Sequence, residues 1–197
     1  TIYKYNYNFI INCHGYISNN DFEKDGNIVF QQHISNIINI LYNIKKNCRT
    51  TLINLGSSHE YMVKETKISE EDGINPISFY GCCKGFLSTL PKFFNESKSN
   101  IKLIHLRLFQ IYGEGQSEPR LIPYLIKFKI NKKKVYLNSA FSKRDFLHID
   151  DFVDLIGKIV FSKDKSKLDI FNVGSGNIHR IVDIDNKLNE LFSKKLA

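Results

Sequence analysis

The sequence predicts an α/β protein with a parallel sheet, on the basis of three observations. Apolar runs at 9–12, 51–55 and 101–109 have the length of buried strands and end in polar or glycine-containing turns. Longer segments between them, 28–46 and 78–95, carry the signals of helices. Strands and helices therefore alternate along the first half of the chain. This order is typical of a parallel sheet, because parallel neighbours need a crossover connection.

The helix expected at 28–46 follows from its apolar residues, which recur mostly three or four positions apart. The polar stretch 16–27 before it is expected to be a loop. Ser78 is a suitable N-cap for the second helix. Pro91 should kink or interrupt that helix before it ends near Asn95.

The remainder of the chain is predicted to continue with shorter elements. Helices are expected at 121–129, from Asp150 or Asp151 to Phe161, and at 183–192. Strands or extended segments are expected at 135–137, 146–149 and 168–173. Gly174-Ser175-Gly176 is interpreted as a turn rather than a phosphate loop, because a third glycine and a following helix start are missing.

The composition indicates a globular protein that is not built to bind nucleic acid. With 42% hydrophobic and 13% aromatic residues, a chain of 197 residues forms one domain or a little more. The net charge of +8 suits an anionic partner, either nucleic acid or a phosphate-bearing small molecule. The lysines are scattered and form no arginine-rich arm or aromatic-interleaved stripe, so no nucleic-acid partner is expected.

The cysteines and the apolar runs bear on location. Cys13, Cys48, Cys82 and Cys83 contain no Cys-x-x-Cys pair and no metal-ligand spacing, so no metal site is predicted. Reduced thiols of this kind favour a cytoplasmic protein. No apolar run approaches the roughly 20 residues of a membrane helix, so no membrane contact is expected.

Candidate chemistry gathers where the predicted strands end. Cys13-His14-Gly15, Gly56-Ser57-Ser58 and the turn from Gln110 to Gly113 each follow a strand. Ligands of open parallel sheets bind outside the carboxyl ends of the strands. These turns are therefore expected to share one edge of the sheet.

Tyr80 and Lys84 form the most informative pair in the sequence. Residues four apart lie on one face of a helix, so the Lys84 ammonium would favour the phenolate form of Tyr80. Such a tyrosine can exchange a proton with a substrate hydroxyl or carbonyl while a hydride moves to or from a nicotinamide ring. The alternative is a helix with a solvated lysine.

Segments along nearly the whole chain resemble, in order, the extended short-chain dehydrogenase/reductases. Within them the chain is similar to the NAD-dependent epimerases and dehydratases that act on nucleotide sugars. Each segment is weak alone, and the ordered combination is specific. The segments are Ile-Ile-Asn-Cys-His-Gly at 10–15, Leu-Gly-Ser-Ser-His-Glu-Tyr at 55–61, the Tyr-x-x-x-Lys helix at 75–84, Leu-Arg-Leu-Phe-Gln-Ile-Tyr-Gly-Glu-Gly-Gln at 106–116, Lys-Arg-Asp-Phe-Leu-His-Ile-Asp-Asp at 143–151 and Phe-Asn-Val-Gly-Ser-Gly at 171–176.

The resemblance implies a partial Rossmann-like, doubly wound parallel sheet plus a smaller α/β substrate-binding part. Residues 1–112 would be the C-terminal portion of an NAD(P)-binding domain, and 113–197 an incomplete nucleotide-sugar-binding part. The family's Gly-x-x-Gly-x-x-Gly phosphate loop is absent from the sequence, and with it the acidic residue that selects NAD over NADP. We therefore expect a piece of a longer protein that alone binds cofactor poorly and exposes a sheet edge. The resemblance also implies a possible homodimer.

Site roles follow from the same resemblance. Tyr80 would be the catalytic acid/base, and Lys84 would bind the nicotinamide ribose of NAD or NADP. Ser57 would hold the reacting oxygen, or Ser58 if the strand end is one residue short. The turn Cys13-His14-Gly15 would pass the adenosine side of the cofactor.

The substrate implied by the resemblance is a nucleotide-diphosphate sugar. Gln110 lies where relatives often carry an Asn that contacts the diphosphate. Arg144 would pair with that diphosphate, since a guanidinium fork suits phosphate oxygens. Arg120 is a candidate for the nucleotide end.

Other interpretations stay open at this point. Ser57 and Ser58 could be turn residues, and Arg144-Asp145 could be a surface ion pair. Glu60 could be an extra base in a dehydratase or a charged loop residue. At the level of function, the alternative is a non-catalytic or truncated Rossmann-like binding module. Three histidines are expected to be structural or solvent-exposed: His14, His59 and His148.

Overall fold

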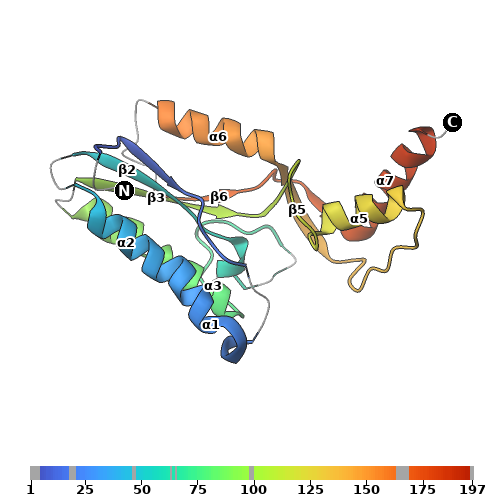
Figure 1. Cartoon of the computed structure of the whole chain (residues 1–197), viewed down its shortest axis with the longest axis horizontal. Helices are drawn as coiled ribbons and strands as arrows, with labels where there is room; N and C mark the ends of the chain where they lie inside the picture. The colour runs from blue at the N-terminus through green and yellow to red at the C-terminus, as the bar shows by residue number, and fades with distance from the viewer. Residues whose placement is uncertain are drawn as a thin grey trace. The chain divides into compact units, whose positions relative to one another are not determined.

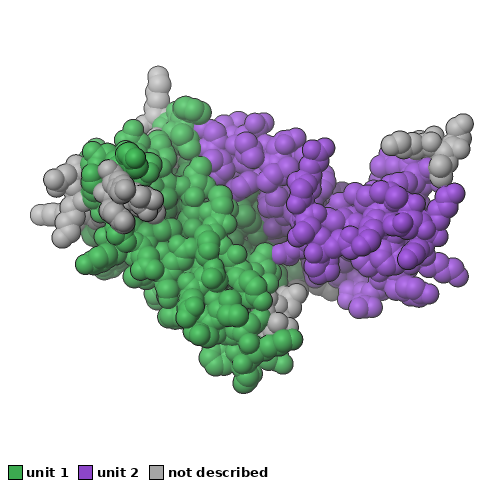
Figure 2. Space-filling view, in the orientation of Figure 1, with its two compact units in different colours: residues 1–108, 159–173 green, residues 109–158, 174–197 purple. Residues whose placement is uncertain are grey.

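The chain folds as two compact units (Figure 2). The computed structural model describes residues 5–17, 21–45, 48–62, 64, 66–97, 100–162 and 169–195. Unit 1 comprises residues 1–108 and 159–173, and unit 2 comprises 109–158 and 174–197. The chain thus leaves unit 1 and returns to it for one more strand. Which part binds cofactor and which binds substrate stays a prediction.

Unit 1 is built on a four-stranded sheet with strand order β1-β2-β3-β6, in which all neighbours run parallel (Figure 1). The parallel α/β sheet predicted from the alternation of elements is therefore confirmed. Leu168, expected in the last strand, lies outside the described residues. The strands are β1 (Phe9–Asn12), β2 (Thr50–Leu55), β3 (Ile101–Leu108) and β6 (Ile170–Val173).

Two helical crossovers cover one face of this sheet (Figure 1). The second is interrupted as Pro91 predicts: one helix ends at Leu87, and Pro91 lies in the first turn of the next, where its missing N–H costs nothing. The first crossover is α1 (Phe22–Phe30), a π-helical turn η2 (Gln31–Ser35) and α2 (Asn36–Asn43), and the second is α3 (Phe79–Leu87) and α4 (Leu90–Glu96).

The loop expected over residues 16–27 was wrong in its second half, because α1 already begins at Phe22. Two features explain the early start. Asp21 precedes the helix in an extended conformation, and Glu23 and Asp25 add negative charge to the first turn, where the helix dipole favours it. Phe22 also packs edge-to-face on Phe79 with ring centroids 4.8 Å apart, a tertiary contact that no local pattern reveals.

The core of unit 1 lies between the sheet and α2. Apolar side chains from α2, α3 and the strands are each at most 8% exposed there. Each such side chain contributes about 1.5–3 kcal/mol on burial, so this cluster fixes the crossovers on the sheet. Its members are Ile37, Ile40, Leu41, Ile44, Leu52, Leu87 and Leu103.

The same face of the sheet turns polar toward the carboxyl ends of the strands. Side chains two apart on a strand share a face, so Leu52 and Asn54 of β2 point the same way, as do Leu103 and His105 of β3. Asn54 and His105 are register partners, and Asn12 of β1 pairs with Asn54 on the other side. A row of buried polar side chains therefore crosses the sheet beside the apolar core.

Unit 2 carries a three-stranded sheet of order β4-β5-β7, in which β4 and β5 are parallel and β7 is antiparallel. β4 and β7 were not predicted; each has three residues and is defined by its pairing with β5. The elements are β4 (Gln110–Tyr112), α5 (Leu121–Ile130), β5 (Lys143–His148), α6 (Ile149–Phe161), β7 (Ile178–Arg180) and α7 (Ile181–Lys195), and the last three residues of α6 belong to unit 1.

The strand expected at 135–137 was wrong. This segment forms no ladder, and Tyr136 at its centre is 76% exposed. An apolar run of three residues directly after Lys132-Lys133-Lys134 has too little side-chain surface to bury against a partner strand.

Candidate functional site

The turn after β2 positions the first candidate residue. Ser57 is the N-cap of a short 3₁₀ helix, η3 (Ser58–Glu60), and its hydroxyl accepts a hydrogen bond from the His59 N–H over 3.2 Å. Glu60 closes the capping box, because its carboxylate accepts the Ser57 N–H over 2.8 Å. Ser57 is buried and Ser58 is half-buried. Both serines therefore lie in a turn, as one interpretation of the sequence has it. Their assignment as residues that hold a reacting oxygen stays a prediction.

Tyr80 and Lys84 lie one turn apart on α3, as predicted. Ser78 caps the helix through a hydrogen bond from the Gly81 N–H over 3.1 Å. Tyr80 is 7% exposed and Lys84 5% exposed, so the interpretation of Lys84 as a solvated lysine was wrong. The Lys84 Nζ lies 5.9 Å from the centroid of the Tyr80 ring.

Lys84 is held against the end of β2. Its Nζ donates to the Leu55 carbonyl oxygen over 2.6 Å, two residues before Ser57. Burial lowers the pKa of Lys84 to about 8, and the negative charge of Glu60 opposes that shift. An ammonium ion in this position can donate to a ligand and exchange its own proton near neutral pH.

Two histidine rings surround Tyr80. The ring of His33, on η2, meets Tyr80 edge-to-face with centroids 5.3 Å apart, and the ring of His59 does so at 5.7 Å. His33 is 3% exposed, and burial, with Lys84 nearby, lowers its pKa to about 4. His33 is therefore neutral at physiological pH. His59, expected to be structural or exposed, has an exposed side chain that contacts the candidate acid/base.

The turn after β1 packs against His33, and the His33 ring in turn contacts Tyr80. A Cβ at Gly15 would lie 2.8 Å from His33 Cε1, so only glycine allows this approach. The His33 Nε2–H donates to the Tyr16 carbonyl over 2.8 Å. The side chains of Cys13 and His14 are exposed beside it. Of the three predicted cofactor-binding turn residues, Gly15 packs against His33, and the His14 ring lies 3.1 Å from the Gln32 carbonyl oxygen of η2.

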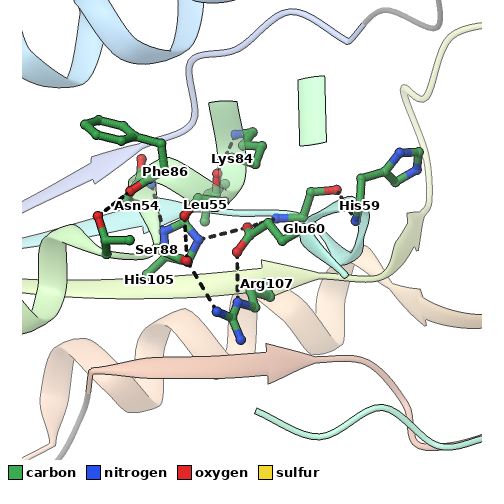
Figure 3. A network of polar contacts seen from close by, with 12 residues as sticks. Asn54, Leu55, His59, Glu60, Lys84, Phe86, Ser88, His105 and Arg107 are labelled. Carbon is green, nitrogen blue, oxygen red and sulfur yellow. Dashed lines mark hydrogen bonds and ion pairs between the residues drawn. The ribbon is translucent and has the colours of Figure 1, made fainter. Parts of the chain in front are cut away.

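A network of buried polar side chains lies under this site (Figure 3). The Asn12 amide donates to Asn54 over 2.9 Å, and the Asn54 amide donates to His105 Nδ1 over 3.0 Å. The His105 Nε2–H then donates to Glu60 over 2.9 Å. Since Nδ1 accepts and Nε2 donates, these bonds fit one neutral tautomer of His105.

The network continues from Glu60 toward β6. The Arg107 Nε–H donates to Glu60 over 2.8 Å, and its Nη1 donates to the Tyr61 hydroxyl. Tyr61 donates in turn to Asn172 of β6 over 2.9 Å. Hydrogen bonds therefore link side chains of all four strands of the sheet.

The interpretation of Glu60 as an extra base was wrong. Its side chain is 0% exposed and its carboxylate is occupied by Ser57, His105 and Arg107. Glu60 lies in the short turn η3, in line with the interpretation as a loop residue, and it is buried there.

The predicted substrate-binding residues belong to unit 2. Gln110 opens β4 and is half-buried. Arg120 is the residue before α5 and is exposed, with no side-chain cap. Arg144 on β5 is exposed, and its Nη1 donates to the Lys143 carbonyl over 2.7 Å. Both guanidinium groups are accessible to an anion.

The contacts of Asp145 test two interpretations from the sequence, the Arg144-Asp145 ion pair and the turn Gly174-Ser175-Gly176. Its carboxylate accepts the N–H groups of Ser175 and Gly176 over 2.8 and 2.9 Å. The side chains of Arg144 and Asp145 have different partners, so the surface ion pair was wrong. The turn Gly174-Ser175-Gly176 directs its N–H groups to this carboxylate, which confirms the interpretation as a turn rather than a phosphate loop.

The described part of the chain forms neither a cluster of metal ligands nor a membrane-spanning helix. Among these residues, no group of three or more histidine, cysteine, aspartate or glutamate side chains is arranged to hold a metal ion. None of the described helices has the length and hydrophobicity required to cross a bilayer.

Comparison of the sequence with known protein families identifies the family of this chain. The sequence matches the NAD dependent epimerase/dehydratase family over residues 2–174. The chain belongs to this family. The resemblance found in the sequence is thereby confirmed for the NAD-dependent epimerase/dehydratase family as a whole.

Two relatives illustrate the family. ADP-L-glycero-D-manno-heptose-6-epimerase of Brachyspira hyodysenteriae is 28% identical over 178 residues, which cover 86% of this chain and 55% of that protein. The dTDP-4-dehydro-6-deoxyglucose reductase of Escherichia coli is 31% identical over 138 residues, 66% of this chain and 43% of that protein. The chain therefore spans about half the length of these curated relatives.

Solved structures of the family share the fold. MoeE5 in complex with UDP-glucuronic acid and NAD has a TM-score of 0.83 at 20% identity, covering 93% of this chain and 62% of that chain. UDP-glucuronic acid 4-epimerase from Bacillus cereus, in complex with UDP-glucuronic acid and NAD, has a TM-score of 0.82 at 22% identity, covering 93% and 59%. The Rossmann-like α/β fold class predicted from the sequence is confirmed.

The described residues of this family member offer donor groups that a bound dinucleotide could use. A lysine ammonium has three donor hydrogens, and the bond to Leu55 uses one of them. Tyr80, Lys84 and the Ser57 turn meet at the carboxyl end of β2, where ligands of parallel sheets bind. For the pyrophosphate end, the sequence contains no Gly-x-x-Gly-x-x-Gly loop.

Sequence reasoning missed His33, His105 and the role of Glu60. A signal for His105 was available, because histidine and arginine interrupt an otherwise apolar strand at 101–108 and buried charged groups need partners. For His33 no comparable signal exists. It lies within a helical pattern, and only the π-helical turn and the packing of Tyr80 distinguish it.

Proposed function

We propose that the protein is an NAD(P)-dependent epimerase, dehydratase or reductase acting on a nucleotide-diphosphate sugar. One observation carries the proposal: Lys84 is buried one helical turn from Tyr80 and bonded to the end of β2 beside Ser57. Burying an ammonium is costly, so a lysine that serves no function there is unexpected. Membership of the NAD-dependent epimerase/dehydratase family supports the same chemistry.

Tyr80 is the acid/base of the proposed mechanism. The positive charge of Lys84, 5.9 Å from the Tyr80 ring, favours the phenolate, which takes the proton of a sugar hydroxyl. A serine hydroxyl, from Ser57 or Ser58, holds the same oxygen by a hydrogen bond. When bound, NAD or NADP supplies the hydride acceptor, and Lys84 holds its ribose.

Residues of unit 2 hold the substrate in this proposal. Arg144 and Arg120 are exposed guanidinium groups, which suit the oxygens of a diphosphate, and Gln110 adds an amide. Relatives support this substrate class, since the names of two of them contain an ADP-linked heptose and a dTDP-linked sugar. Gln110, Arg120 and Arg144 are therefore proposed as substrate-binding residues.

The second candidate is a Rossmann-like binding module without turnover. In this alternative, which the sequence left open, the fold binds a nucleotide or holds a partner without reacting with it.

Calorimetric titration with NAD, NADP and UDP-, dTDP- and ADP-sugars, followed by a turnover assay, distinguishes the two candidates. The enzyme requires both binding and turnover, and Tyr80→Phe should reduce turnover by about 10²–10⁴-fold while nucleotide-sugar binding persists. Tyr42→Phe, at an 88% exposed tyrosine, is the matched control. Binding without turnover in the unmodified protein supports the module instead, and no binding of any of these ligands rejects the enzyme and leaves a module that only holds a partner.

A further inference from the structure

Glu60 stands out among the groups that the proposed mechanism does not use. Its side chain is 0% exposed, and its two carboxylate oxygens accept three hydrogen bonds (Figure 3). One comes from the Ser57 N–H, and the others come from His105 and Arg107 on β3. A buried carboxylate with this many donors has a fixed position.

The bond to Ser57 ties the candidate serine turn to β3. The Ser57 backbone N–H donates to Glu60 Oε1 over 2.8 Å, and His105 Nε2 donates to the same oxygen over 2.9 Å. His105 is in turn fixed through Asn54 and Asn12. The position of the Ser57 backbone is therefore set by a row of side chains across the sheet rather than by the turn alone.

The approach of Glu60 requires Gly56. A Cβ at this position would overlap with the His105 ring and lie 2.5 Å from Glu60 Oε1. The backbone, the imidazole and the carboxylate are thus packed without space for one methyl group. A side chain at position 56 would therefore displace Glu60 or His105 from the arrangement in which Glu60 contacts Ser57.

Glu60 also acts on Lys84 through charge. The titratable groups that face the Lys84 ammonium are Glu60 from η3, His33 from η2, and Tyr80 and Cys83 on its own helix. Among these groups, Glu60 is the largest of the influences that oppose the lowering of the Lys84 pKa by burial.

We propose that Glu60 is a positioning residue of this site, which holds the Ser57 turn against β3 without touching the substrate. The inference rests on the proposed function, because Ser57 and Lys84 matter for turnover only if the site is an epimerase, dehydratase or reductase. A displaced serine turn misaligns the reacting oxygen, and misalignment of about 1 Å can cost about 10²-fold in rate.

Glu60→Gln tests this inference, with the exposed Glu71→Gln as the matched control. Glutamine keeps the shape but removes the charge and presents an NH₂ to groups that themselves donate. We expect kcat for the nucleotide sugar to fall at least about tenfold with KM nearly unchanged. The alkaline limb of the kcat/KM profile should move to lower pH, since Lys84 loses its anionic neighbour.

A readout independent of turnover is the exchange of the Ser57 amide hydrogen. In the unmodified protein this amide should exchange about 10²-fold slower or more than its intrinsic rate, because its partner is buried. In Glu60→Gln the protection should fall about tenfold or more, while the Ile53 amide in β2 stays protected. This measurement on the unmodified protein applies even if the variant does not fold.

The outcomes separate the two proposals. An unprotected Ser57 amide in the unmodified protein, or a folded Glu60→Gln variant with unchanged kcat and pH profile, overturns the role of Glu60 and leaves the proposed function intact. Protection at Ser57 that depends on Glu60, in a protein without turnover, overturns the proposed function and leaves the structural half of the inference.

Discussion

The Nζ of Lys84 donates a hydrogen bond to the carbonyl oxygen of Leu55 over 2.6 Å, so a buried ammonium on α3 is fixed to the last residue of β2. The bond places a cation at the carboxyl end of β2, on the helix that carries Tyr80. It satisfies one donor of Lys84, and the desolvation of the remaining charge lowers the pKa of the group. The arrangement therefore reduces stability near neutral pH in return for a reactive lysine.

Because Lys84 is buried, the unfolding free energy of the protein should depend on pH in the alkaline range. The pKa of Lys84 is lowered from 10.5 to about 8 in the folded protein, so between those values the unfolded chain binds more protons and stability rises with pH. We expect the unfolding free energy of the unmodified protein, relative to Lys84→Met, to rise by up to about 3 kcal/mol from pH 7 to pH 10.5. Urea unfolding at several pH values measures it. A difference that is constant with pH would contradict the burial of the charge.

The buried His33 ring should make the unfolding free energy depend on pH in the acid range as well. Its pKa is lowered from 6.5 to about 4 by burial, so stability is complete above pH 6.5 and is lost as the pH falls toward 4, where the buried ring must accept a proton. We expect a loss of at most about 3 kcal/mol over this window, absent in His33→Gln. Thermal unfolding of both proteins at pH 7 and pH 4.5 measures the loss. Equal shifts in the two proteins would assign it to other groups.

Gly56 should tolerate no side chain. The methyl group of Gly56→Ala would overlap with His105 and Glu60, both of which are fully buried and held by hydrogen bonds. We expect a destabilisation of about 1–3 kcal/mol, as for other overpacked interiors. Gly73→Ala is the matched control, since a Cβ there would meet no atom within 4 Å. Comparable midpoints of urea unfolding for the two variants would show that the strand end can relax.

The sequence allowed prediction of the fold class and of the Tyr80–Lys84 pair, because both depend on local pattern. Apolar runs and helical spacing located β1, β2 and β3, and a spacing of four placed Tyr80 and Lys84 on one face of α3. What could not be predicted depends on contacts distant in sequence. The start of α1, for example, is supported by a contact between Phe22 and Phe79 in addition to the local charges of its first turn.

The side chains around the candidate site could not be predicted for the same reason. Glu60 meets His105 over a separation of 45 residues, and no local pattern encodes that contact. The unpredicted strands β4 and β7 are three residues long and exist through their pairing with β5. The residues that bear the proposed chemistry were therefore readable in the sequence, whereas the side chains that support them were not.

The buried ion pair of Arg107 with Glu60 can be compared with the exposed pair of Arg180 with Asp183 in its contribution to stability. Its guanidinium is 3% exposed and bonds Glu60, Tyr61 and Ser88. Arg107→Met would leave the Glu60 carboxylate buried without its cation, which costs about 3–5 kcal/mol in comparable cases. Arg180→Met is the control, because Arg180 makes two hydrogen bonds of 2.7 Å to Asp183 at the surface.

We expect Arg107→Met to unfold at markedly lower urea concentration and Arg180→Met to match the unmodified protein. The geometry of the Arg180 pair is the better of the two, so geometry alone would predict the opposite ranking. Burial decides the order instead, since water can replace Asp183 as a partner of Arg180 but cannot reach the carboxylate of Glu60. If Arg107→Met were as stable as the control, His105 and the Ser57 N–H would suffice to hold Glu60, and the charge of Arg107 would have no part in fixing the serine turn.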